Sequence, residues 1–461
     1  MWRWLLLTCL LLAGLAPGAL AQGVSQRTDY LAAELDDTQL TERLARATRL
    51  SDELTPLGAI RAGNGTDIPV WRGGLRMPPL GYLAIGQPHI DPFADETELL
   101  RLSADNLSDY RYFVTPGLQA LLERYPGRAY LSVYPSHRTA AAPDTVYEQT
   151  YKNVIRAETS WDGSGFYYAW GGIPFPLPDN GQQVIWNHLA SWRGKQLQAR
   201  WREIQVSGEQ QHVINWLVQE DYPYYFQRDR CLLPLARCEP DRRNGRSKRK
   251  DLTLFQRQWS AVGQGLLRTT HQLELREGVE HSYRRQQGGW PDGWNSDLRS
   301  ADDVSLFSGS PQQYHWMLLG KRELYIPYNN YRFEALDDAV LLQPGHLASA
   351  ALRFEKHRVW VVDGTLKKGA TNPYSKRVYY VDEDSWQIAL ADFYGADGQL
   401  QRLGLALLKS FYELPAVLPA ATVIHDLDTG SYSVTGLESG QAEMRHFDQA
   451  IEGEGIMVEI D

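Results

Sequence analysis

The chain has 461 residues and a formal net charge of −9, an acidity that argues against nucleic acid as its main partner. Aromatic residues make up 11 % of the sequence, which is typical of β-sheets and of ligand-facing surfaces. A large β core would by itself account for most of them.

Residues 1–21 have the features of a secretory signal peptide. Arg3 precedes an apolar run that extends from Trp4 to about Leu15, and small residues lead up to Ala21. Glycine and proline interrupt this run before it reaches the roughly 20 apolar residues that a membrane span needs. We therefore expect cleavage after Ala21 and export of the chain.

Residues 22–150 alternate short helical patterns with connectors rich in glycine and proline. The stretch around Pro116 predicts a short helix, because proline is favoured at the first helical position. The remainder has neither a helical nor a strand period. We predict an irregular N-terminal segment that packs on the rest of the chain.

A stiff, aromatic-rich stretch follows at residues 171–194. Its prolines fix an extended conformation, and Asp179 or Asn180 can then cap a helix over residues 181–193. Ile185, Leu189 and Trp192 fall on one side of this helix and give it a bulky apolar face.

From Lys195 to the end, segments with a period of two dominate, and Glu277-Gly278, Asp363-Gly364 and Asp397-Gly398 lie where hairpins would turn. About ten consecutive strands with short connections predict an antiparallel meander that curls and carries helices on its concave face. An outer-membrane barrel is a competing architecture, but many strands carry charges on both faces.

Cys231 and Cys238 would be the only cysteines after signal cleavage, and they lie close together in the sequence. In an oxidising compartment this favours a disulfide over a zinc site, which would need further ligands. The basic segment 242–250 lies close behind. It could meet an anionic headgroup or an acidic partner, or form a solvated loop.

No motif for covalent catalysis, phosphate binding or metal binding occurs in the sequence. The acidic stretch Asp382–Asp384 could bind calcium but lacks EF-hand spacing, so we interpret it as a tight turn. Nothing marks a pair of carboxylates for glycoside cleavage. We therefore predict no catalytic residues, no cofactor and no metal.

Two loops, residues 134–139 and 325–333, combine polar and aromatic side chains. These side chains could orient a ligand headgroup, or they could instead form hydrogen bonds that fix the loops. The headgroup candidates are His137, Arg138, Asn329, Asn330 and Arg332.

Six stretches resemble one bacterial family, domain-of-unknown-function family 1329, whose members are periplasmic and often labelled outer-membrane lipoprotein-sorting proteins. The similar stretches are residues 54–74, 134–153, 169–188, 323–333, 357–367 and 376–400. The two-cysteine basic insertion at residues 231–250 is not part of the pattern. The family has no established catalytic residues.

The resemblance implies a mainly β (α+β) fold: a strongly curved antiparallel sheet, an incomplete β-barrel of LolA/LolB type closed by helices, with an irregular N-terminal wrap. Residues 151–461 would form the half-barrel with a lid helix at 181–193, and residues 22–150 would pack on it. It also implies a periplasmic location, peripheral to the outer membrane. An inner-membrane transporter of the resistance-nodulation-division type and an outer-membrane protein are the expected partners.

We therefore predict a non-enzymatic carrier or chaperone for a lipid, a lipidated protein or another hydrophobic molecule. Two alternatives stay open: a hydrolase or lyase that acts on a lipid or polymer, and a ligand-free adaptor subunit of a transport complex. The candidates for the cavity and its lid are the apolar residues Trp170, Phe175, Ile185, Leu189, Trp192, Trp201, Tyr325, Tyr331 and Trp360.

Overall fold

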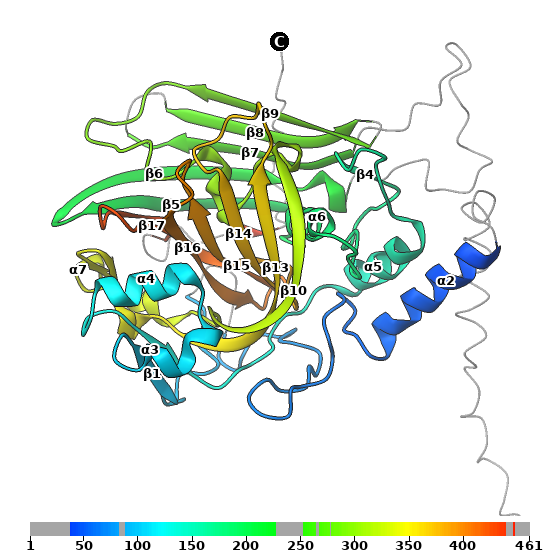
Figure 1. Ribbon diagram of the computed structural model, residues 1–461, viewed down its shortest axis with the longest axis horizontal. Coiled ribbons are helices and arrows are strands. Elements are labelled where there is room, and N and C mark those ends of the chain that lie inside the picture. The colour runs from blue at the N-terminus through cyan, green and yellow to red at the C-terminus, as the bar shows by residue number, and fades with distance from the viewer. Residues whose placement is uncertain are drawn as a thin grey trace, which may run out of the picture. The chain divides into compact units, whose positions relative to one another are not determined.

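A computed structural model describes residues 37–82, 88–226, 252–263, 267–276 and 278–438, together with the backbone of 446–447 (Figure 1). The chain divides into two units. Met1–Ala45 and Arg228–Lys248 make up the first, of which only the beginning of helix α2 (Asp37–Thr48) is described. Arg46–Gln227 and Arg249–Asp461 make up the second unit. The second unit holds all the strands named below.

The second unit is built mainly from strands. They are β1 (Leu100–Ser103), β2 (Tyr130–Val133), β3 (Glu158–Thr159), β4 (Phe166–Tyr167), β5 (Gln196–Ser207), β6 (Gln210–Asp221), β7 (Leu252–Ala261), β8 (Arg268–Arg276), β9 (Val279–Gln287), β10 (Tyr314–Pro327), β11 (Leu342–Gln343), β12 (His346–Leu347), β13 (Phe354–Leu366), β14 (Lys376–Asp382), β15 (Ile388–Tyr394), β16 (Leu400–Phe411), β17 (Ala416–Asp426), β18 (Tyr432–Leu437) and β19 (His446–Phe447).

Helices are few and short. The α-helices after α2 are α3 (Leu107–Tyr110), α4 (Pro116–Arg124), α5 (Asp144–Arg156), α6 (Gly181–Leu189) and α7 (Asp338–Leu341). The 3-10 helices are η1 (Arg49–Ser51), η2 (Arg111–Phe113), η3 (Pro223–Tyr225), η6 (Ala301–Leu306), η7 (Pro311–Gln313), η8 (Arg332–Ala335) and η9 (Ser349–Ala351). No helix in the described ranges is both long and apolar enough to cross a membrane.

One curved, almost entirely antiparallel sheet holds fifteen of the described strands (Figure 1). Its main path is β1-β2-β13-β14-β15-β16-β17-β18-β5-β6-β7-β8-β9, with β10 paired to β13 and β19 to β5. Along this path β1 and β9 stand at opposite ends and do not pair with each other, so the described sheet does not close. The predicted mainly β fold, an incomplete barrel, is confirmed.

The strand order differs from a single meander in chain order. Strands β5 to β9 form one meander and β13 to β18 form another, and β18 pairs with β5 to join them. Residues 22–150 also contribute β1 and β2 to the sheet, beyond the predicted irregular segment and short helices.

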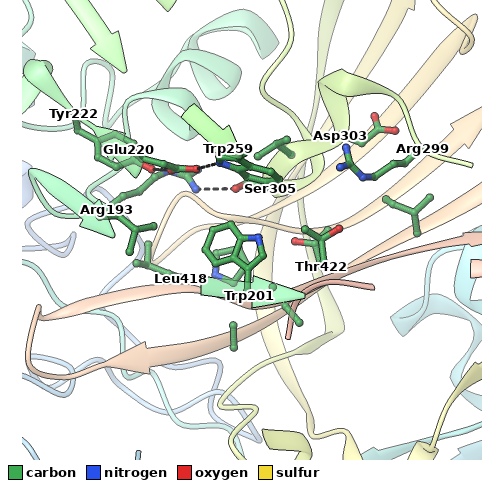
Figure 2. A pocket seen from close by; sticks show the side chains of 18 residues that line it. Arg193, Trp201, Glu220, Tyr222, Trp259, Arg299, Asp303, Ser305, Leu418 and Thr422 are labelled. Carbon is green, nitrogen blue, oxygen red and sulfur yellow. Dashed lines mark hydrogen bonds between the residues drawn. The ribbon is translucent and has the colours of Figure 1, made fainter. Parts of the chain in front are cut away.

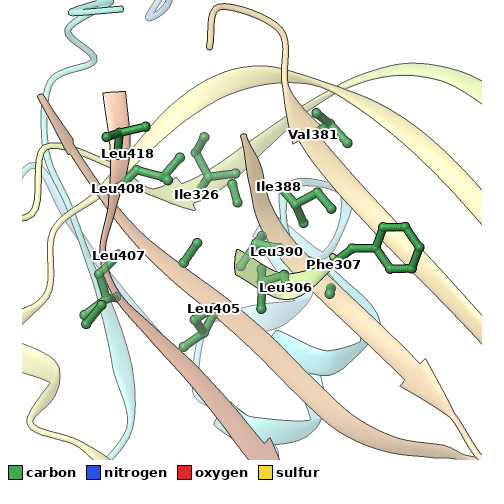
Figure 3. Packing of buried hydrophobic residues seen from close by; sticks show 14 of the residues in the cluster. Leu306, Phe307, Ile326, Val381, Ile388, Leu390, Leu405, Leu407, Leu408 and Leu418 are labelled. Atoms are coloured by element: carbon green, nitrogen blue, oxygen red, sulfur yellow. The ribbon is translucent and has the colours of Figure 1, made fainter. Parts of the chain in front are cut away.

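Helices cover both faces of the central strands, not the concave face alone. In β16, Leu403 lies against Gly117 of α4, whereas the next residue, Gly404, lies against Leu306 of η6. Neighbouring residues of a strand point to opposite faces, so α4 and η6 lie on opposite sides of the sheet. Every residue of β15 except Tyr394 is therefore buried, and this packing fills the core (Figure 3).

Two helix starts agree with their sequence signals. The side chain of Asn180 accepts a hydrogen bond from the Gln183 backbone N–H and caps α6. Thr115 caps α4, and Pro116 occupies its first position. Helix α6 ends at Leu189, however, earlier than the predicted end at residue 193.

One predicted turn is wrong. Asp363 and Gly364 lie inside β13, where they pair with Met317 and Trp316 of β10, because both neighbouring strands extend past this point. The turn at Asp397-Gly398 connects β15 to β16 as predicted. The remaining predicted turn is Glu277-Gly278. Strands β8 and β9 pair up to Arg276 and Val279, so the chain reverses between these two residues.

Three predictions lie outside the described residues. They are the signal peptide at residues 1–21, the Cys231–Cys238 disulfide and the basic segment 242–250.

Candidate functional site

A small pocket opens between the sheet and the segment that leads into η6 (Figure 2). Its volume is about 70 Å³, room for a few water molecules or a short stretch of an alkyl chain. Strands β5, β17 and β18 form its apolar floor, and residues 299–305 form its roof.

Two β-bulges shape the floor. Ala420 is the extra residue of β17 between the pairs Leu407–Ala421 and Leu408–Pro419. Gly436, with φ of 101°, is the extra residue of β18 opposite β5. Bulges interrupt the alternation of side chains and are enriched near functional sites. They explain why consecutive residues of β17 and β18 line the pocket.

Apolar atoms dominate the floor. Trp201 of β5 lies there, and its ring packs edge-on against Trp259 of β7, 5.3 Å between centroids. Leu418 and Ile424 of β17 line the same floor. Such a surface gains free energy when it covers an alkyl chain, roughly 0.8 kcal/mol for each buried methylene.

Arg193, which follows the C-terminal end of α6, lines the pocket with a buried guanidinium. One terminal nitrogen donates to Ser305 Oγ at 3.1 Å and the other to the His188 carbonyl at 3.3 Å. Nε is buried without a hydrogen-bond partner. Burial lowers the pKa of Arg193 to about 10, so the side chain is charged at neutral pH.

The other charged groups that line the pocket have partners of opposite charge. Glu220 pairs with Arg257 at 3.2 Å and accepts a hydrogen bond from Trp259 Nε1 at 2.9 Å. Arg299 pairs with Glu203 at 2.7 Å, and Asp303 pairs with Arg377 at 3.0 Å. Within the part of the chain that the structure describes, Arg193 is therefore the lining charge without an ion pair.

The roof has an unusual backbone. Ser305 and Leu306 both have positive φ, 52° and 66°, a conformation that costs free energy for residues other than glycine. The fully buried Leu306 side chain, which packs against Gly404, holds the roof down.

The nine apolar candidates do not gather at this pocket. Trp201 lies in its lining. Phe175, Ile185, Leu189 and Trp192, which lie in α6 or in the segments that flank it, are buried in the core. The remaining candidates lie elsewhere: Trp170 and Trp360 are half-buried, and Tyr325 and Tyr331 are buried. Their roles in ligand binding stay predictions.

The five headgroup candidates lie apart from the pocket, and protein groups occupy their polar atoms. Arg138 holds Asp384 through two hydrogen bonds of 2.7 and 2.8 Å. Asn329 donates to Glu355 at 2.9 Å, and Asn330 donates to the Arg353 carbonyl at 3.0 Å. These contacts fix the two loops, and headgroup binding by these residues stays a prediction.

His137 and Arg332 complete this second group. The ring of His137 stacks on Phe93, with centroids 4.1 Å apart, and contacts Glu96 at 2.5 Å. Arg332 donates to the Tyr134 hydroxyl and to the Glu96 carbonyl at 3.3 Å. Both side chains therefore tie the loop at residues 134–139 to its neighbours.

Sequence reasoning missed Arg193, although it follows a candidate directly. One signal could have located the floor: Pro419 interrupts an apolar strand, and proline within a sheet favours a bulge. Sequence reasoning also considered Asp382–Asp384 as ligands and interpreted them as a turn, but it missed His357, which completes a set of side chains with metal-ligand spacing. The set is His357, Asp382 and Asp384, whose ligand atoms lie within 4.8 Å of one another.

A family model described as "Protein of unknown function (DUF1329)" matches residues 101–244 and 289–455. An uncharacterized protein of Pseudomonas aeruginosa is 32% identical over 449 residues, which cover 91% of this chain and 94% of that protein. Two solved structures are similar at low identity. A DUF1329 family protein from Desulfovibrio piger has a TM-score of 0.31 and 11% identity over 56% of this chain and 88% of its own.

The second solved structure is a LolA superfamily protein from Nitrosomonas europaea, with a TM-score of 0.33 and 10% identity over 59% of this chain and 96% of its own. Both scores describe a partial superposition.

Proposed function

The chain belongs to the DUF1329 family, and we propose that it is a periplasmic carrier that binds one amphipathic molecule in the pocket beneath η6. One observation carries this proposal: a bulged, apolar floor lies next to a buried arginine that has no ion-pair partner in the described chain. The alkyl part of the molecule would cover the floor, and an anionic head would meet Arg193.

Free energies support this division of roles. Each methylene moved from water to the floor contributes roughly 0.8 kcal/mol. A hydrogen bond to a charged group contributes about 1.5–3 kcal/mol when the partner is fixed. An anion at Arg193 would also offset the unfavourable burial of an uncompensated charge.

The volume of the pocket sets a condition on the mechanism. At about 70 Å³ it is too small for a long acyl chain. Lipid binding therefore requires the roof at residues 299–305 to move, and the strained Ser305-Leu306 segment is the place where we expect it to turn. Partnership with a transporter and with an outer-membrane protein rests on the family resemblance alone.

The test is a titration of purified mature protein with a fluorescent fatty acid and with the matching fatty alcohol. We expect Thr435→Phe, which fills the pocket from a half-buried position, to weaken binding of both probes at least tenfold. Thr365→Phe, at an exposed position of β13, is the matched control and should bind both probes as the wild type does.

Arg193→Gln tests whether the anionic head of the ligand binds Arg193. It removes the charge and, because glutamine is shorter, also the two terminal nitrogens that bond to Ser305 Oγ and the His188 carbonyl. We expect it to weaken the fatty acid about 10- to 100-fold, the equivalent of 1.5–3 kcal/mol, and to leave the alcohol unchanged. Equal binding by wild type, Thr435→Phe and Arg193→Gln would refute the proposal.

The ligand-free adaptor is a second candidate, favoured by a specific observation. Central strands buried on both faces leave a small pocket, as expected when the interior of a half-barrel is filled by its own side chains. Purification from the periplasm followed by solvent extraction and mass spectrometry separates the two. An amphiphile recovered in stoichiometric amount supports the carrier function. A protein that contains no ligand, binds neither probe and crosslinks to a membrane partner supports the adaptor function.

A further inference from the structure

A second buried polar cluster lies where β13 meets the turn after β14. His357 belongs to β13, and Asp382 is the last residue of β14. The register pairs Asp382 with Val359, so His357 extends just beyond the end of β14. The turn at residues 383–385 folds back over this point and carries Asp384.

All three side chains are buried. Asp382 is fully inaccessible, His357 is 1 % exposed and Asp384 is 3 % exposed. Charged groups are seldom buried to this extent unless they are paired or bind a metal. The partners of each group therefore decide what the cluster can do.

Glu355 fixes the tautomer of His357. Glu355 lies two residues earlier on the same face of β13, and its carboxylate lies 3.2 Å from His357 Nε2. A carboxylate accepts only from a protonated nitrogen, so Nε2 carries hydrogen. In the neutral ring Nδ1 then presents a lone pair, the arrangement that orients many metal-binding histidines.

That lone pair faces another acceptor. Nδ1 of His357 lies 3.7 Å from Asp382 Oδ1, too far for a direct hydrogen bond. Oδ1 is buried without a hydrogen-bond partner, although Oδ2 accepts from the Ser385 backbone N–H at 3.0 Å. When the ring is neutral, two electron-donating atoms, Nδ1 and Oδ1, therefore face each other at 3.7 Å.

Among the described residues, no arginine or lysine pairs with Asp382. Arg138 is paired to Asp384, and Arg353 is paired to Glu355 at 2.6 Å. Lys321 forms an ion pair with Glu383 at 2.6 Å. Among the described residues, His357 is the nearest basic group to Asp382, at a distance that excludes a hydrogen bond.

A second unpartnered atom borders the cluster. Tyr328 is fully buried, its ring lies 4.0 Å from the ring of His357, and its hydroxyl has no hydrogen-bond partner. Buried polar atoms without protein partners are rare in folded proteins, and a bound ion or water is a common reason. Tyr328 therefore packs directly against His357 at the edge of the cluster.

We propose that His357, Asp382 and Asp384 form a structural binding site for one divalent transition-metal ion, with Zn²⁺ as the best match. Ligand atoms about 2.0–2.2 Å from one ion lie about 3–4 Å from each other, and the 3.7 Å between Nδ1 and Oδ1 fits this spacing. One imidazole and two carboxylates suit Zn²⁺ or Mn²⁺, whereas Ca²⁺ and Mg²⁺ prefer ligands that are all oxygen.

Asp384 can act as a ligand although Arg138 holds it. Each carboxylate oxygen has two lone pairs, and Arg138 uses one on each oxygen. The arginine then orients the ligand from the outer shell, as Glu355 orients His357. The ion would tie β13, the turn after β14 and the loop of Arg138 together.

The first experiment is metal analysis of full-length mature protein, purified from the periplasm without chelator and without a metal-affinity column. We expect close to one Zn²⁺ or Mn²⁺ for each chain. Protein stripped by unfolding in chelator and then refolded should gain about 3 °C or more in Tm when Zn²⁺ is added. Ca²⁺ at the same concentration should give no shift.

Variants assign the site. Asp382→Asn and His357→Gln are close in shape to the wild type and should lose both the bound metal and the Zn²⁺-dependent shift. The matched control is Asp392→Asn, another buried aspartate in the adjacent strand β15 that is bonded to Tyr380 and to Gly117. It should keep both.

Measurements on the wild type alone can decide the matter if a variant fails to fold. Fewer than about one ion in ten chains, together with no Tm shift from Zn²⁺ or Mn²⁺ after refolding, would overturn the proposal. Metal retained at full occupancy in folded Asp382→Asn and His357→Gln would overturn it as well. Neither result bears on the pocket, whose lining contains none of these residues.

Discussion

At the scale of single residues, burial sets the protonation of several groups. His188 is fully buried between α6 and the sheet. Its Nε2 lies 3.1 Å from the Phe307 carbonyl, and its Nδ1 lies 3.1 Å from the Trp386 carbonyl and 3.3 Å from the Ile388 N–H. Burial, helped by the nearby charge of Arg193, lowers the pKa of His188 to about 3. The folded protein therefore holds His188 neutral throughout the physiological range.

This depressed pKa predicts acid sensitivity. Between about pH 6.5 and pH 3 the unfolded chain binds a proton at His188 that the folded chain does not bind. The free energy of unfolding should therefore fall as the pH falls through this window, by about 1.4 kcal/mol for each pH unit from this residue. Urea unfolding at pH 7, 6, 5 and 4 measures the slope.

His188→Gln is the comparison for that slope. Glutamine retains one donor and one acceptor but does not titrate. His425, whose pKa burial also lowers to about 3, contributes equally to both proteins. The variant should show a slope shallower by about one proton, and identical slopes would mean that His188 is charged in the folded state.

At the scale of elements, short-range signals position α6, the helix that carries Leu189 and leads to Arg193. Prolines deliver the chain in an extended conformation, Asn180 caps the first turn, and Gly181 fits against Met317 and Val362 without a Cβ. The sequence left Asp179 and Asn180 open as caps, and the structure decides for Asn180. Because Asn180 is exposed, its substitution isolates the cap from packing.

We expect Asn180→Ala to lower the free energy of unfolding by about 1 kcal/mol, since it removes the hydrogen bond to the Gln183 N–H. Asp179→Ala is the matched control. It removes an exposed ion pair to Arg46, which contributes at most about 1 kcal/mol and usually less. Urea denaturation measures the free energy of unfolding of both variants. An equal or larger decrease for Asp179→Ala would contradict the assignment of Asn180 as the cap.

At the scale of the whole molecule, the large second unit depends on strands that are distant in sequence. The pairing of β18 with β5 joins the two meanders. In the meander β13 to β18, helices cover both faces of the sheet, as the contacts of β16 with α4 and η6 show. The other end of the sheet is different. Strand β9 is mostly exposed and has a single described neighbour, β8.

This asymmetry predicts a gradient of local stability. Amides of β15 should exchange hydrogen only through global unfolding, whereas β9 should open locally. We expect exchange in β9 to be at least about 100-fold faster, a difference of about 2.7 kcal/mol. Hydrogen exchange with mass spectrometry on peptides that contain β9 and β15 measures the ratio. Equal protection of the two strands would contradict the prediction.

Parts of the candidate site could be predicted and parts could not. The period of two that is predicted from Lys195 onward holds in β5, where Leu197, Ala199 and Trp201 are buried and Trp201 lines the pocket. The bulges at Ala420 and Gly436 break that alternation, so a strict period of two cannot locate the floor. Arg193 carries no local mark, because its role depends on which carboxylates the fold brings near it.

The sequence by itself determined the family, the mainly β character, most strands and the cap and start of α6. Each of these follows from residues that lie within a few positions of one another, where side-chain alternation and hydrogen bonding to the nearest turn decide the conformation. The tertiary structure alone decided that β18 pairs with β5, that helices cover both faces and that His357 meets Asp382. These contacts join residues far apart in the chain, and the summed packing of the whole core decides which of them form.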